Sequence, residues 1–476
     1  MKFRYFLLTL LVPALVCCNK PVPDPEPEPE PKDDPVTATI TANDVTVEEG
    51  QTAQITATTN SSAAITYSSA DAAVATVSAA GLVTGVKAGS TTVTLSVAAV
   101  EDKFTAAETT INVTVTAPDV PPLPADLPPE IKNGDTVLAP NANVEKFLTD
   151  IHYPTHDYSS SELRKWAEEN GVSVCPGNSD RPEEYTIRWT PDASATDVTV
   201  TVSEPDRDWV YTPSTPEDPY VTITNLLPNT HYTYKAVSGS KVLTEGAFDT
   251  VGKVHQVFFR TRIRNCRDLG GWKTEDGKTV KYRMVYRGGR LEPSYLSKVG
   301  KKTLVTEGIK AQLDLRGHSD VLSESTLKGI VDDYEFCAPV VEEGYAQMLK
   351  QDKEKTRQCI QFIMDCVDKN KPVYFHCSLG RDRTGTVAML TLGILGVPEG
   401  DISQEYELTQ FAPHGYATSD GEKTKMLRTV DYKGAANVIW GYAGENGSFQ
   451  DGVNAYFLEI GISQADIDKF KANMLQ

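Results

Sequence analysis

The chain has 476 residues, enough for about three domains of 100–200 residues each, and 40% of them are hydrophobic, so it can build real cores. Its 46 Lys and Arg against 65 Asp and Glu give a formal charge of −19, which argues against nucleic acid as a partner, because that binding needs a basic surface. Residues 1–254 hold 16 basic and 35 acidic residues, whereas residues 255–476 hold 30 of each. The second half is therefore neutral and does not oppose anion binding with its own charge.

The N-terminus has the pattern of a bacterial export signal. Lys2 and Arg4 precede an apolar run over residues 5–16 that is too short to span a bilayer. The run ends in Leu-Val-Cys-Cys, which resembles a bacterial lipobox, and Cys18 fits the lipidated position better than Cys17. We expect residues 1–18 to be a lipoprotein signal peptide and the protein to be exported and lipid-anchored in the cell envelope, at the outer membrane on its periplasmic or surface side. The alternative is an ordinary secretory signal with two incidental cysteines.

Residues 19–35 form the next predicted segment, a linker in which prolines alternate with Asp and Glu. Proline restricts φ and the carboxylates repel one another, so this segment cannot build a core. We expect an extended stalk that rises on the order of 3 Å per residue. It is typical of a spacer between a membrane anchor and folded domains.

Residues 36–117 are rich in Thr, Val and Ala with period-2 alternation, which predicts short strands separated by polar turns. The stretch over residues 74–93, with glycines where tight turns need a positive φ, resembles the bacterial Ig-like (group 2) family. That resemblance implies an all-β sandwich. Such modules act as spacers more often than as binding domains, although glycan or protein contact is the alternative.

A second β module is predicted over residues 184–254, with strands near residues 185–189, 197–202 and 231–237. Its Leu-Leu-Pro-Asn-Thr-His-Tyr segment, ending at Tyr232, resembles the tyrosine corner of fibronectin type III domains. Trp189, Trp209 and His231 are interpreted as packing residues rather than ligands. Residues 118–183 between the modules are predicted to be a linker with one helix over residues 161–170.

The strongest signal lies at residues 372–395, where a buried strand, a short loop and an apolar helix are predicted in succession. Such a loop gathers unpaired N–H groups and the positive end of the helix dipole, so it binds anions. Cys377 opens the loop and Arg383 closes it. In such surroundings the pKa of a cysteine falls from about 8.5 to roughly 3.5–7.5, and an arginine can grip two phosphoryl oxygens. Cys377 would then attack phosphorus and form a cysteinyl-phosphate that water hydrolyses.

This His-Cys-x5-Arg-Thr pattern resembles the protein tyrosine phosphatase superfamily. The resemblance implies that His376 tunes the thiolate and that Thr384 donates a hydrogen bond to it. It also implies a phosphate cradle made by the backbone N–H groups that follow the cysteine. The implied substrate-binding residues are His376, Ser378, Leu379, Gly380, Arg381 and Thr384.

A second set of motifs resembles the bacterial tyrosine-phosphatase-like group. Residues 265–272 read Asn-Cys-Arg-Asp-Leu-Gly-Gly-Trp, residues 285–291 read Val-Tyr-Arg-Gly-Gly-Arg-Leu, and residues 314–316 read Asp-Leu-Arg. Arg381 stands where that group usually has Lys, so the cation is kept with a different reach. The resemblance extends over residues 255–476. It implies a multidomain chain in which two all-β sandwiches precede an α/β domain with a central, mainly parallel sheet flanked by helices.

The leaving group needs a proton, so a carboxylic acid is expected near the cradle. Asp382 is the first candidate, because it lies within the loop and the resembling group has an acid there. Asp314, at the end of a neighbouring strand, is the second. Both remain open to a structural alternative, in which Asp314 pairs with an arginine such as Arg316 or Arg267.

The substrate is predicted less closely than the chemistry. Residues 253–290 carry 11 Lys and Arg against three acids, which favours a multiply charged ligand unless these cations are a solvated face balanced elsewhere. A phosphorylated protein is the first expectation, and an inositol phosphate or phosphoinositide the second. The rival from another class is a surface binding lipoprotein with an idle phosphatase fold. We expect no cofactor and no metal, because thiolate, arginine and backbone already supply the nucleophile and charge stabilisation.

Overall fold

The computed structural model describes residues 34–117, 123–153, 160–172, 180–192, 194–260, 262–341, 345–412 and 432–476. The predicted signal peptide with Cys18, nearly all of the predicted stalk, and Cys175 lie outside these ranges. In the part of the chain that is described, no helix is long and apolar enough to cross a membrane. The chain divides into two compact units, Met1–Pro121 and Pro122–Gln476.

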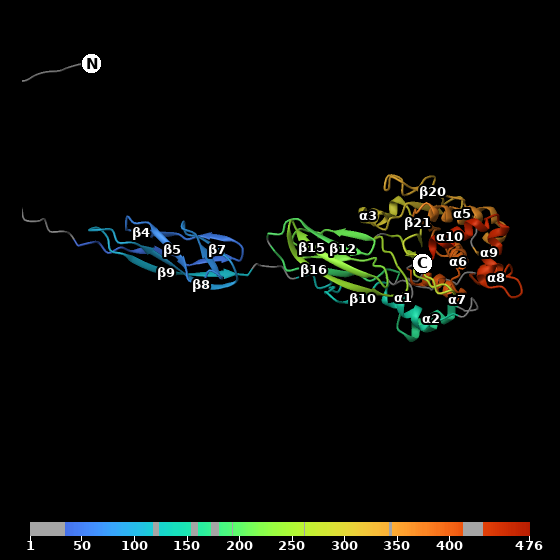
Figure 1. Ribbon diagram of the computed structural model, residues 1–476, viewed down its shortest axis with the longest axis horizontal. Helices are drawn as coiled ribbons and strands as arrows, with labels where there is room; N and C mark the ends of the chain where they lie inside the picture. Colours follow the sequence, from blue (N-terminus) through green and yellow to red (C-terminus); the bar gives the residue numbers. More distant parts are fainter. Residues whose placement is uncertain are drawn as a thin grey trace, which may run out of the picture. The chain divides into compact units, whose positions relative to one another are not determined.

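The first unit consists of strands alone within its described residues (Figure 1). Alternate side chains of β8 and β9, among them Val93, Leu95 and Val113, are buried in one core, as the period-2 pattern predicts. The sheets have the orders β2-β9-β8-β5 and β3-β7-β6, beside a β1-β4 pair. The strands are β1 (Ile40–Ala42), β2 (Val45–Glu48), β3 (Thr52–Gln54), β4 (Ala57–Thr59), β5 (Ile65–Ser69), β6 (Ala75–Val77), β7 (Leu82–Gly85), β8 (Gly89–Val97) and β9 (Ala107–Thr116).

The second unit begins with a β region in which a five-stranded sheet, β10-β16-β15-β12-β13, accompanies a β11-β14 pair. Tyr232 anchors a corner of this region: its hydroxyl accepts a hydrogen bond from Leu227 N–H at 2.9 Å and donates one to Glu204 at 2.8 Å. The strands are β10 (Thr136–Leu138), β11 (Tyr185–Arg188), β12 (Val198–Glu204), β13 (Arg207–Tyr211), β14 (Tyr220–Ile223), β15 (His231–Ser238) and β16 (Lys241–Val251).

The segment predicted as a linker, residues 118–183, takes part in the fold. Its strand β10 pairs in parallel with β16. The prediction missed α1 (Ala142–Asp150), which buries Phe147 in the core of the α/β domain described below. The predicted helix is present as α2 (Ser160–Glu169), and its Trp166 lies in the same core. The linker interpretation underestimated this segment, because its apolar residues are too sparse to show a strong period by themselves.

The remaining residues form an α/β domain around the sheet β17-β18-β21-β19-β20. β18, β21, β19 and β20 run parallel, and only β17 is antiparallel to its neighbour. Val373 and Phe375 of β21 face one core while Tyr374 faces another, so the sheet is buried on both sides. The strands are β17 (Arg267–Asp268), β18 (Val285–Gly288), β19 (Ala311–Asp314), β20 (Glu335–Cys337) and β21 (Val373–His376).

Helices surround this sheet, and α6 follows directly after the central strand β21 (Figure 1). Twelve of the 14 residues of α6 are buried, in keeping with the apolar run that predicts it. The helices are α3 (Lys298–Thr306), α4 (Tyr345–Gln351), α5 (Lys353–Asp368), α6 (Asp382–Leu395), α7 (Glu399–Glu407), α8 (Tyr432–Trp440), α9 (Phe449–Glu459) and α10 (Gln464–Met474), with short 3-10 turns η1 (Pro293–Tyr295) and η2 (Leu408–Phe411).

Candidate active site

Residues 377–383, which comprise the loop after β21 and the first two residues of α6, are called the cradle loop below. The carbonyl oxygens of Ser378, Leu379 and Gly380 accept hydrogen bonds from outside the loop, from Arg290 N–H at 3.1 Å and from the Asn265 side chain at 3.3 and 2.9 Å. In a trans peptide the N–H points opposite to the C=O, so the following N–H groups point to the inside of the loop. Together with the N-terminus of α6 they form an anion site.

Gly380 is required by the shape of this loop. Its φ is +68°, in the left-handed region, and a Cβ there would lie 2.3 Å from the carbonyl carbon of Gly288. The adjoining Gly288 is equally constrained, because a Cβ would lie 2.1 Å from the Tyr374 hydroxyl. The glycines of the two predicted motifs therefore let the cradle loop and β18 approach each other closely.

Cys377 is 3% exposed and lies at the start of the cradle loop as a free thiol. Burial is the largest influence on its pKa and raises it, but hydrogen bonds from Thr384 and the charge of Arg383 outweigh burial and leave the pKa of Cys377 below its ordinary value. The buried Thr384 hydroxyl has no nitrogen or oxygen partner among the described residues, so it is available to the sulfur. The structure thus brings the predicted nucleophile, hydroxyl and arginine together.

His376 is fully buried and neutral. Gln312 Oε1 accepts from Thr326 N–H at 2.8 Å, so its amide nitrogen donates to His376 Nε2 at 2.9 Å, and the ring proton resides on Nδ1. That proton is donated to the Cys377 carbonyl oxygen at 3.2 Å. Burial lowers the pKa of His376 to about 4. His376 therefore orients the cradle loop through the backbone and carries no charge at neutral pH.

Arg383 enters the site from the first turn of α6. Its guanidinium donates to the carbonyl oxygens of Leu315 at 3.0 Å and Val341 at 3.1 Å, which hold it across the carboxyl ends of the neighbouring strands. Val340, next to one of these acceptors, has φ +57°, an unusual conformation for a β-branched residue. Two carbonyl contacts leave further guanidinium N–H groups available for a bound oxyanion.

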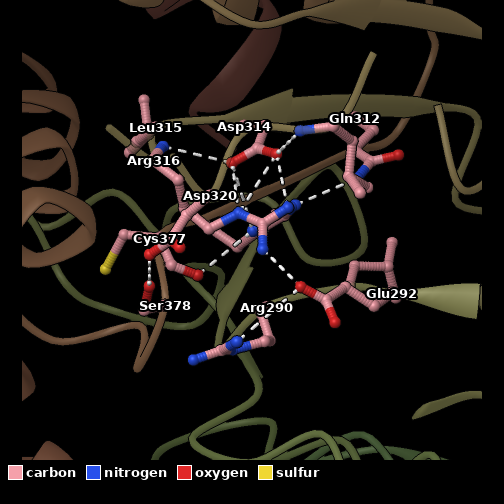
Figure 2. A network of polar contacts seen from close by, with 12 residues as sticks. Arg290, Glu292, Gln312, Asp314, Leu315, Arg316, Asp320, Cys377 and Ser378 are labelled. Atoms are coloured by element: carbon pink, nitrogen blue, oxygen red, sulfur yellow. Dashed lines mark hydrogen bonds and ion pairs between the residues drawn. The ribbon is translucent and has the colours of Figure 1, made fainter. Parts of the chain in front are cut away.

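Asp314 adopts the structural alternative that the sequence left open. Its carboxylate is gripped by the Arg316 guanidinium, with Nε and Nη2 at 3.0 and 2.9 Å, and it also accepts from Leu322 N–H (Figure 2). Burial raises the pKa of Asp314, but hydrogen bonds from Arg316 outweigh that effect and the pKa falls below its usual value. Glu292 contacts the same Arg316. Asp314 is thus held as an ionised structural group rather than as a proton donor.

Asp382, the first predicted acid, is turned toward its neighbour in the loop. Arg381 Nε lies 2.6 Å from Asp382 Oδ1, and Nη2 lies 3.1 Å from Oδ2, so the pair is bidentate. The Tyr406 hydroxyl is 3.4 Å from the same carboxylate. Arg381, which stands where the resembling group usually has Lys, therefore pairs with Asp382.

Buried ion pairs support the outside of the cradle loop. Arg287 on β18 donates to the Gly380 carbonyl oxygen and to Glu405 at 2.6 Å, and Arg267 on β17 binds the other oxygen of Glu405 at 2.6 Å. Arg267 also donates to Asn265, the residue that binds the loop carbonyls. Burial and the neighbouring charge of Arg287 lower the pKa of Arg267 to about 10. The Asn-x-Arg-Asp and Tyr-Arg-Gly motifs thus act as a frame for the loop.

Most of the cations that suggested a multiply charged ligand have a partner within the protein, and three of them, Arg267, Arg283 and Arg287, are in buried ion pairs. Arg283 pairs with Glu307 and Glu204, Arg260 pairs with Glu184, and Lys253 donates to a carbonyl of α1. Further members contact Glu405, Asp276, Thr279 or Glu292; they are Arg267, Arg287, Lys278, Lys273 and Arg290. The charge count therefore gives little support to a polyphosphate site.

Two carboxylates near the site escaped the sequence interpretation. Glu405 on α7 binds both framing arginines, and Asp320, in the loop after β19, accepts from the Ser378 hydroxyl at 3.5 Å (Figure 2). Neither belongs to a motif, and only tertiary packing brings them to the loop. Among the described residues, no three His, Cys, Asp or Glu side chains gather as a metal site requires.

Comparisons with known proteins bear on two regions of the chain. The family model for the tyrosine phosphatase family matches residues 260–476, and the model for the bacterial Ig-like domain (group 2) matches residues 36–108. These matches confirm the two resemblances on which the phosphatase and Ig-like predictions rest, and they agree with a β-rich N-terminal region followed by a domain of sheets and helices.

Two curated relatives carry tyrosine-protein phosphatase names. One, from Cupriavidus necator, is 28% identical over 173 residues, 32% of this chain and 62% of the relative. The other, from Nostoc commune, is 28% identical over 145 residues, 28% of this chain and 49% of the relative. This chain thus spans about half to three fifths of their lengths. A solved structure of TpbA from P. aeruginosa with phosphotyrosine covers 39% of this chain and 91% of its own, at 12% identity and a TM-score of 0.24, too low to support an argument.

Proposed function

We propose that the protein is a cysteine-dependent phosphomonoester hydrolase that acts as a tyrosine-protein phosphatase. The observation that carries this proposal is Cys377, a buried thiol whose pKa is nevertheless lowered, at the start of a loop whose N–H groups point inward. Burying a thiolate costs free energy, so a buried thiol with a lowered pKa indicates a functional site. The family match over residues 260–476 and the names of both relatives support the same chemistry.

The mechanism follows from the positions of these groups. The N–H groups of the cradle loop and the Arg383 guanidinium bind the phosphoryl oxygens and neutralise their charge as it redistributes. Cys377 Sγ attacks phosphorus in line, the bond to the leaving oxygen breaks, and a carboxylic acid protonates that oxygen. Water then hydrolyses the cysteinyl-phosphate. His376 and Thr384 act in both steps by holding the thiolate and the loop.

The substrate follows from what remains at the mouth of the site. Because most cations of residues 253–290 already have a partner within the protein, three of them in buried ion pairs, a single phosphate monoester is favoured over an inositol polyphosphate. A phosphotyrosine side chain also carries an aryl leaving group, which departs more readily than an alkyl one. An inositol phosphate or phosphoinositide and a non-catalytic binding protein remain the alternatives to be tested.

The deciding experiment measures phosphate release without added metal from a phosphotyrosine peptide, a phosphoinositide and inositol hexakisphosphate. We expect release from the peptide, and its loss by at least about a thousandfold in Cys377→Ser, since the nucleophile is removed. Cys337→Ser, which changes a half-buried thiol on β20, is the matched control. No release from any substrate, with phosphate still bound, would instead favour the binding-protein alternative.

We further infer an exported lipoprotein whose modules place the enzyme away from a membrane. Residues 1–18 would be the signal, Cys18 the lipidated residue, and residues 19–35 the stalk. The sheets of residues 36–117 and 184–254 support two sandwiches, one Ig-like and one fibronectin type III-like, the latter with the Tyr232 corner. Metabolic labelling with a palmitate analogue, compared between the wild type and Cys18→Ala, tests the anchor.

A further inference from the structure

The loop after β19 passes along the mouth of the cradle loop. Leu315 N–H donates to the His376 carbonyl at 2.8 Å, and the Leu315 carbonyl accepts from Arg383. At Gly317, a Cβ would lie 3.8 Å from the Arg383 guanidinium, so the loop remains close to the site as it turns. The N–H groups of Asp320 and Val321 both donate to the Gly317 carbonyl, at 3.0 and 3.1 Å, and this turn fixes where the Asp320 side chain begins.

Asp320 faces the residue next to the nucleophile. Its Oδ2 lies 3.5 Å from the Ser378 hydroxyl, one residue after Cys377, and the Asp320 side chain is exposed (Figure 2). This distance is long for a hydrogen bond, as is common in ligand-free sites where catalytic contacts tighten when substrate binds. A carboxyl here can therefore reach a leaving group that projects from the loop toward solvent.

Among the residues that the structure describes, the other carboxylates discussed above are held by cations. Asp314 and Glu292 bind Arg316, Asp382 binds Arg381, and Glu405 lies outside the loop between two arginines. Asp320 forms no ion pair within the described ranges; its side-chain contact is a neutral hydroxyl. The charged and titratable groups on the elements that meet here are His318, two residues before Asp320 on the same loop, and Arg383 and Cys377 at either end of the cradle loop. This carboxyl is therefore not bound to a guanidinium as Asp314 and Asp382 are.

We propose that Asp320 is the catalytic residue that protonates the leaving oxygen, an inference that rests on the phosphatase function proposed above. As Cys377 Sγ bonds to phosphorus, the electron pair of the breaking P–O bond goes to the leaving oxygen, which takes the proton of the Asp320 carboxyl. In the second step the Asp320 carboxylate removes a proton from the attacking water, the P–S bond breaks, and the thiolate and inorganic phosphate are released. The balance is one ester and one water consumed, with one alcohol and one phosphate formed.

The test compares Asp320→Asn with Asp382→Asn in the full chain, using aryl phosphates of increasingly basic leaving groups and an alkyl phosphate. Asp320→Asn should lose at least about a hundredfold in kcat/KM, which reports the first step alone, for the alkyl and poorest aryl esters, yet little for dinitrophenyl phosphate, whose leaving group needs no proton. It should also lose the alkaline fall of its pH–rate profile. Asp320→Glu should restore part of the lost rate, and Asp332→Asn, at an exposed carboxylate before β20, should match the wild type.

Three results would overturn or redirect the proposal. An equal loss on all leaving groups in Asp320→Asn would show that Asp320 only positions Ser378. A leaving-group-dependent loss in Asp382→Asn instead would return the role to the cradle loop. Turnover that survives in Cys377→Ser would reject the phosphatase mechanism itself, so the two failures are distinguishable. Iodoacetamide labelling of Cys377 in the Asp320 and Asp382 variants reports whether the site is still folded.

Discussion

The five described cysteines of the α/β domain differ in the direction in which their surroundings move the thiol pKa. Burial raises the pKa of Cys266 and of Cys366 to about 12, and it raises those of Cys359 and Cys337 as well. Cys377 is buried too, yet its pKa is lowered. The difference lies in the hydroxyl and N–H of Thr384 and in Arg383, which act only on Cys377. Cys377 is therefore the cysteine that we expect to be reactive among these five.

This contrast predicts selective alkylation. A free thiol has a pKa of about 8.5. Because the pKa of Cys377 is lowered, Cys377 remains a thiolate at a lower pH than a free thiol does. We expect iodoacetate at pH 7 to modify Cys377 first, as measured by mass spectrometry of peptides. Thr384→Val removes a hydrogen bond to the thiolate, so the midpoint of the alkylation rate should move to higher pH.

The matched control is Thr386→Val, two residues along α6. The Thr386 hydroxyl donates to the Asp382 carbonyl at 3.0 Å. Thr386 is not among the groups that shift the pKa of Cys377. Its alkylation midpoint should equal that of the wild type. Modification of Cys266 or Cys359 before Cys377 would contradict the assignment.

Single residues also show what the sequence can and cannot predict. The spacing of Cys377 and Arg383 between a strand and a helix is enough to place both at one anion site, because both residues belong to the same short segment. Whether Asp382 or Asp314 is the acid was not predictable from the sequence. Each carboxylate is oriented by an arginine whose own orientation depends on packing. Asp320 and Glu405 approach from distant segments and carry no local signal.

At the scale of elements, α7 connects the periphery of the domain to the cradle loop. Glu405 on this helix binds arginines from β17 and β18, and Thr409 of the following turn accepts from Asn265 at 3.2 Å. All these groups are buried, so their charges are unscreened by water. The cradle loop is therefore held in place by residues of an element outside it.

Replacing Glu405 with Gln should destabilise the protein strongly. The change leaves Arg267 and Arg287 buried beside each other without a counter-charge, and breaking a buried pair in this way costs about 3–5 kcal/mol of unfolding free energy. Urea unfolding measures that loss, and phosphate affinity should weaken as well. Glu335→Gln is the control: its partners Lys369 and Lys371 are partly exposed, so a loss of about 0–1 kcal/mol is expected. Equal effects of both substitutions would refute the framing role.

The elements themselves were largely predictable. Period-2 alternation located β8, β9, β12 and β15, and the apolar run after the cradle loop located α6. α1 and β10 were missed because a three-residue strand or a nine-residue helix has too few apolar positions to show a period. The pairing of β10 with β16 depends on a partner more than a hundred residues away.

At the scale of the whole molecule, the second unit is one folding body rather than a β module joined to an enzyme. Phe147 of α1 contacts Phe411 at a ring distance of 5.5 Å, and Gln404 of α7 donates to the Ile151 carbonyl. From the β region, Glu204 pairs with Arg283, and Arg207 donates to the Thr306 carbonyl at 2.9 Å. The contacts of Phe147 and Ile151 reach the helix that carries Glu405 and the turn after it, so the N-terminal part of the unit supports the site indirectly.

The boundary of the family match therefore does not coincide with the folding boundary. A fragment of residues 260–476 lacks α1, α2 and the β region, which leaves Phe411 uncovered and Arg283 without Glu204, so it should unfold at a much lower temperature than residues 122–476. Phe147→Ala in the intact chain isolates one contact and should cost about 3–5 kcal/mol, because it opens a cavity beside Phe411 and Trp166. Deletion of residues 1–121, a separate compact unit, is the control and should leave the melting temperature of the second unit unchanged, as followed by calorimetry. Equal melting of the 260–476 and 122–476 fragments would show instead that the phosphatase domain folds without the segment that precedes it.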